Sequence, residues 1–151
     1  MTKPNYYRKS NHTTYDCRYH IVFIPKYRYH VLSDEKVATF VKTVFEQVCN
    51  NNEVVIIEGK IRSNHVHLYL SVPPKHSIAD IVKYLKEKSA SRSFRQFPEL
   101  LKRYCGRHFW ARGYFVSTVG ITDDIIKAYI HNQEEKERQE EEQLRQLKLW
   151  K

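Results

Sequence analysis

The residues best suited to do chemistry stand on one predicted strand, where apolar and polar side chains alternate without exception over 65–72. Because successive side chains of a strand point to opposite faces, His65, His67, Tyr69 and Ser71 share one face. Two imidazoles at this spacing lie close enough to chelate one divalent ion, and neutral imidazole is a common ligand of transition metals. Two surface histidines on a half-solvated strand would give the same pattern.

A second pair of candidate residues lies on the last predicted helix. Tyr129 and Gln133 are four positions apart, so they lie on one helical face about one turn from each other. A tyrosine hydroxyl, with a pKa of about 10, is a poor nucleophile unless its barrier is lowered, and a divalent ion on a scissile phosphate is one means. Two histidines and an amide oxygen would hold that ion and leave positions open for phosphate oxygens. The alternative for Tyr129 is a packing role, with its ring inward and its hydroxyl at the rim.

This combination of residues suits strand transfer in DNA. Attack by the tyrosine would form a phosphotyrosine link and free the other DNA end as a hydroxyl. The bond energy is conserved, so a later hydroxyl can reverse the step without ATP.

The elements that must position these residues follow from hydrophobic patterning. Strands are predicted over 15–24, 54–58, 65–72 and 113–119. Helices are predicted after the caps Ser33, Ser77 and Thr122. The order β-α-β-β-α-β-α is the split β-α-β (ferredoxin/RRM-like) pattern of an α+β protein, an antiparallel sheet with helices on one face and a C-terminal helix that bears Tyr129. The other face of the sheet is then free for function.

Length and composition set the broad class. A chain of 151 residues predicts one domain, expected over 1–133, with 134–151 as a charged helical extension. No apolar run reaches the roughly 18 to 20 residues of a membrane helix, and the amino-terminal residues lack a secretory signal, so we expect a soluble cytoplasmic protein without a membrane partner. The three cysteines form no CxxC pair, which argues against a disulfide framework.

Charge indicates the partner. The chain has 26 Lys and Arg against 17 Asp and Glu, a net charge of +9, and residues 134–151 carry a net charge of −1. The globular part is therefore strongly basic, and its many aromatic residues suit the unstacked bases of single-stranded nucleic acid. Cations on the first strand and second helix are candidates for phosphate contacts, although a solvated face would look alike: Arg18, Lys26, Arg28, Lys86, Lys88 and Arg92.

Five segments, in the same order, resemble one known family. They are CRYHIVFIPKYRYHVL at 17–32, the HVH of NHVHLYLSV at 64–72, YLKEKSASR at 84–92, FWARGYFVSTVG at 109–120 and YIHNQ at 129–133. The chain resembles the single-tyrosine HUH transposases, the TnpA family of the insertion sequence 200/605 group. Glu87 departs from the pattern, because the family usually has Gly there, but it touches no candidate catalytic residue.

The resemblance implies a mechanism and partners. It implies that His65, His67 and Gln133 bind Mg²⁺ or Mn²⁺, and that Tyr129 forms a 5′-phosphotyrosine intermediate on single-stranded DNA with hairpin ends. It also implies a homodimer in which the tyrosine helix can complete the active site of the partner subunit.

Three alternatives remain open at this point. A domesticated relative would apply the same chemistry to chromosomal repeat hairpins. A non-catalytic RRM-like module would bind nucleic acid through strand aromatics, but it leaves the spacing of Tyr129 and Gln133 unexplained. A metal-dependent nuclease that uses water would not need Tyr129.

Overall fold

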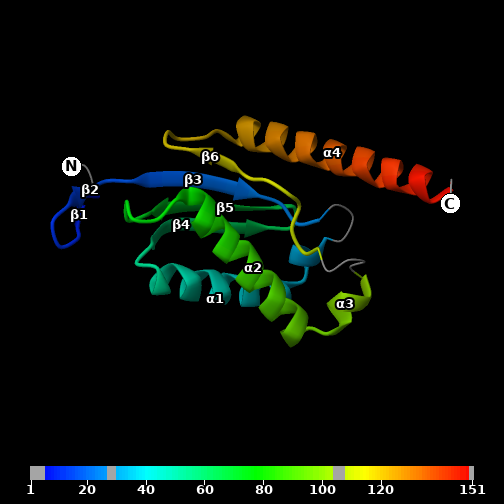
Figure 1. Ribbon diagram of the computed structural model, residues 1–151, viewed down its shortest axis with the longest axis horizontal. Coiled ribbons are helices and arrows are strands. Elements are labelled where there is room, and N and C mark those ends of the chain that lie inside the picture. Colours follow the sequence, from blue (N-terminus) through cyan, green and yellow to red (C-terminus); the bar gives the residue numbers. More distant parts are fainter. Residues whose placement is uncertain (1–5, 27–29, 104–107, 150–151) are drawn as a thin grey trace.

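Four segments rich in β-branched and aromatic residues pair into one antiparallel sheet (Figure 1). The computed structural model describes residues 6–26, 30–103 and 108–149. The strands of the sheet lie side by side in this order: β4 (Val55–Arg62), β5 (His65–Ser71), β3 (Arg18–Phe23) and β6 (Phe115–Ser117). The two central strands, β5 and β3, are therefore paired on both sides.

Two long helices cover one face of the sheet, α1 (Glu35–Asn51) and α2 (Ile78–Gln96) (Figure 1). The apolar stripe of α1, with Val41, Val44 and Phe45, is buried against Ile21 and Phe23 of β3. The order of strands and helices confirms the predicted split β-α-β arrangement. Four further elements are short: β1 (Arg8–Lys9) and β2 (Thr14–Tyr15), which pair with each other, the 3₁₀ turn η1 (Val31–Ser33), and α3 (Glu99–Arg103).

One of the three predicted helix caps is wrong, and two are confirmed. The cap of α1 is Asp34, whose carboxylate accepts a hydrogen bond from the backbone N–H of Lys36 at 2.9 Å, and not Ser33. The second and last helices begin as predicted, because Ser77 accepts from the N–H of Asp80 at 3.0 Å and Thr122 caps the N–H of Ile125 at 3.3 Å.

Strand lengths were also predicted imperfectly. β4 continues to Arg62 instead of ending at 58, because pairing with β5 supplies partners along its full length after a register shift at Ile56 and Glu58. β6 is shorter than predicted, Phe115–Ser117 instead of 113–119. Gly113 stands at φ 86°, outside the strand region, and Ser117 exchanges hydrogen bonds with the backbone of Val119 at 3.0 and 3.1 Å.

The sequence pattern predicted that the second face of the sheet would be free, but part of this face is covered. The helix α4 (Asp123–Leu149) lies across it, on the side opposite α1 and α2 (Figure 1). Ile126 and Ile130 are buried there against Val22 and Ile24, the residues of the β3 segment that alternate with those facing the other helices. Apolar side chains on both sides of β3 therefore require cover on both faces.

No helix within residues 6–26, 30–103 and 108–149 combines the length and the apolar character needed to cross a membrane.

The packing of α4 predicts unequal effects of two similar substitutions. Ile130 is 7% exposed and Ile125, on the same helix, is 41% exposed. Ile130→Ala should lower the free energy of unfolding by about 2–4 kcal/mol through the lost burial and the cavity. Ile125→Ala should change it by about 0.5 kcal/mol or less. Urea unfolding of both variants measures the difference, and equal effects would show that α4 does not pack on the sheet in this way.

Candidate active site

The polar face of β5 carries the two histidines that the alternation predicted. His65, His67 and Tyr69 are half-buried, whereas Val66 and Leu68 between them are buried in the core. β5 is paired with β4 on one side and β3 on the other, so both imidazoles stand on an interior strand, with His65 at its first residue.

The surroundings of both imidazoles favour the neutral form. Burial lowers the pKa of His65, and the neighbouring Arg62 lowers it further, while Asp123 at the start of α4 opposes the shift. Burial also lowers the pKa of His67, with further contributions from the nearby His20 and His65. A neutral ring keeps one nitrogen lone pair, so both side chains are in the form that binds a metal ion.

A third histidine, His20 of β3, lies against this pair and was missed by the sequence reasoning. Its Nδ1 is 3.1 Å from Nε2 of His67, and its ring stacks on Tyr69 with centroids 4.0 Å apart and planes 8° apart. Alternation within β3 could have shown that His20 points away from Ile21. Its neighbours depend on the register of β3 against β5, in which His20 is directly opposite Tyr69.

Tyr129 sits on α4 with its ring half-buried against Phe115, the two ring centroids being 5.9 Å apart. Its hydroxyl is buried and has no hydrogen-bond partner among the residues that the structure describes. Burial raises the pKa of Tyr129 to about 12, and the side chain of Gln133 opposes part of that rise. In this arrangement the tyrosine is protonated and shielded.

Gln133 lies one turn further along α4, at the rim of an open cavity of about 610 Å³. Gly113 lies next to this side chain, and a Cβ atom added to Gly113 would make an ordinary van der Waals contact with the amide nitrogen of Gln133 at 3.6 Å. Lys26, Trp110 and Glu137 also line the cavity.

Within one chain, the histidine pair and the α4 pair remain separate. Across the described residues, no hydrogen bond or ring contact joins Tyr129 or Gln133 to His65 or His67, and no cluster of three or more His, Cys, Asp or Glu side chains could hold a metal ion. The two imidazoles suit a divalent ion by ligand type and protonation state. They supply two protein ligands, and a third would have to come from another side chain.

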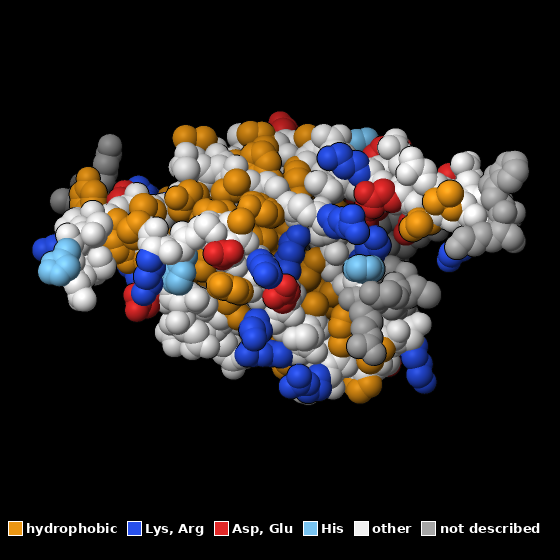
Figure 2. All heavy atoms as spheres, viewed as in Figure 1, with side chains coloured by type: hydrophobic (Ala, Val, Ile, Leu, Met, Phe, Trp, Pro, Cys, Tyr) orange, Lys and Arg blue, Asp and Glu red, His pale blue; other side chains and the backbone are white. Residues whose placement is uncertain are grey.

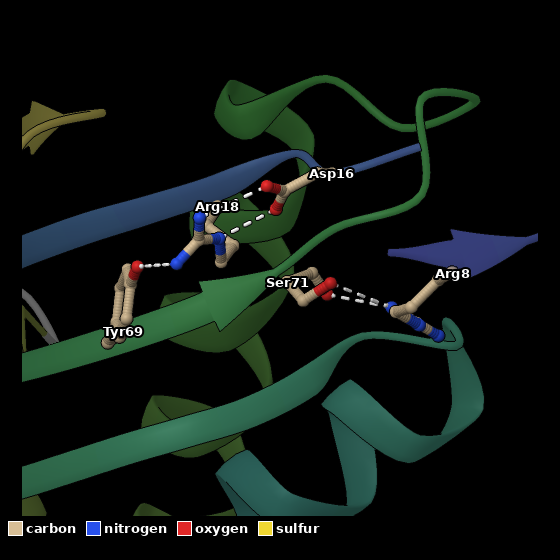
Figure 3. A network of polar contacts seen from close by, with 5 residues as sticks. All are labelled: Arg8, Asp16, Arg18, Tyr69 and Ser71. Carbon is tan, nitrogen blue, oxygen red and sulfur yellow. Dashed lines mark hydrogen bonds and ion pairs between the residues drawn. The ribbon is translucent and has the colours of Figure 1, made fainter. Parts of the chain in front are cut away.

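The candidate phosphate-binding cations have different surroundings. Arg18 forms an ion pair with Asp16 at 2.6 Å and donates to the Tyr69 hydroxyl at 2.8 Å (Figure 3). Lys26 lies 3.6 Å from the carboxylate of Glu137, and Arg28 falls outside the described residues.

Several Lys and Arg side chains lie on the face of the molecule that α2 covers (Figure 2). Lys88 is exposed, and Arg92 is half-buried and donates to the side chain of Gln47 at 2.7 Å. The ammonium of Lys86 is instead directed inward, to the carbonyls of Ala111 at 2.9 Å and Gly113 at 2.6 Å. Burial lowers the pKa of Lys86 to about 8, so this side chain is still charged at pH 7.

Comparison with known proteins identifies the family. The family model described as "Transposase IS200 like" matches residues 13–133. A transposase for the insertion sequence element IS200 from Salmonella typhimurium is 39% identical over 131 residues, covering 87% of this chain and 86% of that protein. The chain belongs to the IS200-like transposase family.

Further relatives agree in sequence and in fold. The ISDra2 transposase TnpA of Deinococcus radiodurans is 35% identical over 131 residues, 86% of this chain and 93% of that protein. A crystal structure of a candidate transposase from the same species has a TM-score of 0.75 at 36% identity, covering 83% of this chain and 97% of the other. A REP-associated tyrosine transposase bound to a REP hairpin shares the fold, with a TM-score of 0.52 at 10% identity over 80% of this chain and 68% of the other.

Membership of the IS200-like transposase family makes the chain an enzyme of DNA transposition that transfers DNA strands. The matched region contains all four candidate residues for chemistry, His65, His67, Tyr129 and Gln133, and ends at the last of them. The extension 134–151 lies outside the match, although its described part continues α4 without a break to Leu149.

The position of Lys86 predicts that its main effect is on stability. Lys86→Met removes the donor for two backbone carbonyls, and we expect a loss of about 1–3 kcal/mol in the free energy of unfolding. The matched variant Lys88→Met, at an exposed cation, should leave stability within about 0.5 kcal/mol. Thermal or urea unfolding distinguishes the two, and equal stability of both variants would refute a structural role for Lys86.

Proposed function

We propose that this transposase cleaves and rejoins single-stranded DNA through a covalent bond to Tyr129, with a divalent ion bound by His65, His67 and Gln133. The observation that carries the proposal is the pair of neutral, half-buried imidazoles on one face of an interior strand, in a chain of the IS200-like transposase family. Mg²⁺ and Mn²⁺ are the expected ions, and Gln133 supplies the amide oxygen as third ligand.

In the chemical step, the Tyr129 hydroxyl oxygen attacks the scissile phosphorus and gives up its proton. The new oxygen–phosphorus bond replaces the bond to the 3′ oxygen of the neighbouring nucleotide, which leaves as a hydroxyl and takes up a proton. The bound ion supplies stabilisation of the negative charge that develops on the phosphate oxygens. The number of phosphodiester bonds is conserved, so the same residues can run the step in reverse with a different 3′ hydroxyl.

A homodimer with composite active sites accounts for the separation of the two residue pairs. The Tyr129 hydroxyl is buried with a pKa raised to about 12, and no described contact joins it to the histidines of its own chain. A nucleophile must be accessible and close to its phosphate. A dimer in which α4 leaves this packing and lies beside the histidine pair of the partner subunit would release the hydroxyl and bring Gln133 to those histidines.

The proposed DNA substrate carries hairpins at the ends of the element. The net charge of +9 and the cations on α2 favour a polyanion, and one structure with this fold is bound to a REP hairpin. Phosphate contacts from Lys88, Arg92 and Arg18 would give affinity that falls with salt concentration.

The covalent step predicts a protein–DNA adduct that resists SDS. Purified protein is incubated with labelled single-stranded DNA that carries an element end, in the presence of Mg²⁺ or Mn²⁺. Wild-type protein should form the adduct, and Tyr129→Phe, His65→Ala and chelation with EDTA should each abolish it.

The controls are substitutions of the same types at exposed positions, Tyr7→Phe and His12→Ala, which should leave the adduct intact. Cleavage that survives in Tyr129→Phe would instead identify a nuclease that uses water. Binding without an adduct in either metal would favour a non-catalytic nucleic-acid-binding module.

Composite sites predict complementation between two inactive proteins. In a dimer of one His67→Ala subunit and one Tyr129→Phe subunit, one site would combine intact histidines with an intact tyrosine. Mixing the two variants under conditions of subunit exchange should therefore restore adduct formation, with the DNA linked to the subunit that carries His67→Ala. If each site were built from one chain, both sites of the mixed dimer would be defective and the mixture would stay inactive.

A further inference from the structure

His20 contacts one of the two proposed metal ligands directly, and nothing in the proposed chemistry gives it a role. It belongs to β3, and its Nδ1 lies 3.1 Å from Nε2 of His67 on β5. We propose that His20 is a positioning residue, which holds the ring of His67 in the orientation and tautomer that binds the ion. The inference rests on the proposed function in one respect, that His67 is a ligand.

The hydrogen bond between the two rings sets which nitrogen of His67 is available. When Nε2 of His67 carries the proton and donates to Nδ1 of His20, the lone pair of His67 is on Nδ1. Histidines that bind metals usually donate their second ring N–H in this way, and the acceptor fixes both tautomer and ring orientation. His20 is placed to be that acceptor.

The neighbouring ligand has an equivalent partner. Nδ1 of His65 lies 2.8 Å from the side-chain oxygen of Asn64. An amide oxygen can only accept, so His65 donates from Nδ1 and keeps its lone pair on Nε2. In each proposed ligand, one ring nitrogen is within hydrogen-bond distance of a neighbouring side chain, and the other ring nitrogen is available to bind the ion.

His20 is itself held in place by a chain of contacts across the sheet. Its ring stacks on Tyr69, its direct cross-strand partner, at 4.0 Å. The Tyr69 hydroxyl accepts a hydrogen bond from Arg18 at 2.8 Å, and Arg18 is paired with both oxygens of Asp16 at 2.6 and 3.0 Å (Figure 3). The stack fixes the plane of the His20 ring, because a rotation out of that plane would break the contact with Tyr69.

The register argues for positioning and against a third ligand. His67 is opposite Val22, and His20 is opposite Tyr69, so His20 lies diagonally from His67 in the direction away from His65. Among the residues that the structure describes, no three His, Cys, Asp or Glu side chains, His20 included, form a group that could hold a metal ion.

The first test is the affinity of the full-length protein for Mn²⁺, measured by the loss of the free-ion EPR signal. His20→Phe keeps an aromatic ring against Tyr69 but removes the nitrogen, and should weaken Mn²⁺ binding about 10- to 100-fold. His20→Gln restores a group that can accept from His67 and should recover most of that loss. His12→Phe, at an exposed histidine of the β1–β2 hairpin segment, should bind as wild type does.

Wild-type Mn²⁺ affinity in a folded His20→Phe protein would overturn the inference. If His20→Phe fails to fold, Tyr69→Leu provides the test instead. This substitution removes the ring on which His20 stacks and leaves both histidines in the sequence. Weaker Mn²⁺ binding in Tyr69→Leu supports the inference, and unchanged binding overturns it. If wild type and His67→Ala bind Mn²⁺ equally, the proposed ion site itself is wrong.

The second test needs neither metal nor DNA. Long-range ¹H–¹⁵N NMR spectra report the tautomer of each histidine ring. Wild-type protein should show His67 protonated at Nε2, and His20→Phe should show a mixture of tautomers for His67. Protonation of His67 at Nδ1 in the wild type would refute the role assigned to His20, whatever the fate of the metal site.

Discussion

The alternation of side chains along β5, an interior strand, is the constraint on which the site depends. Val66, Leu68 and Leu70 pack into the core beneath α1 and α2, and this places His65 and His67 on the opposite face. A shift of one residue in the pairing of β5 would bury the imidazoles and expose the apolar residues. The hydrophobic core therefore sets the orientation of the face that carries the histidines.

The second face is divided between chemistry and packing. At the end of β3 and beside β6 it is apolar and is covered by α4 through Ile126 and Ile130, whereas the part around β5 is polar. Tyr129 packs against the same apolar cluster as Ile126 and Ile130. The packing that holds α4 in place therefore also removes the tyrosine hydroxyl from solvent. Stability of the single chain and reactivity of Tyr129 as the proposed nucleophile are thus opposed, because the same contacts that stabilise α4 shield the hydroxyl.

The basic surface is not uniform in role. Lys86 faces inward and bonds the carbonyls on either side of Arg112, in the segment that leads to Gly113 and the side chain of Gln133. Lys86 thus links α2 to the turn at Gly113, which lines the same cavity as Gln133. Lys88, two residues along the same helix, points to solvent and is free to meet a phosphate. A count of cations in the sequence does not separate these two uses, because both belong to one basic segment.

The sequence by itself determined the order of strands and helices, the caps of the second and last helices, the polar face of β5 and the common face of Tyr129 and Gln133. These features depend on spacing along one element, with periods of 2 for strands and 3.6 for helices. The sequence did not determine where β4 and β6 end, that α4 covers part of the second face, or that Lys86 points inward. Each of these depends on residues that are distant in the chain. Tertiary structure alone placed His20 against His67: the two are 47 residues apart, and only the register of β3 on β5 makes them neighbours.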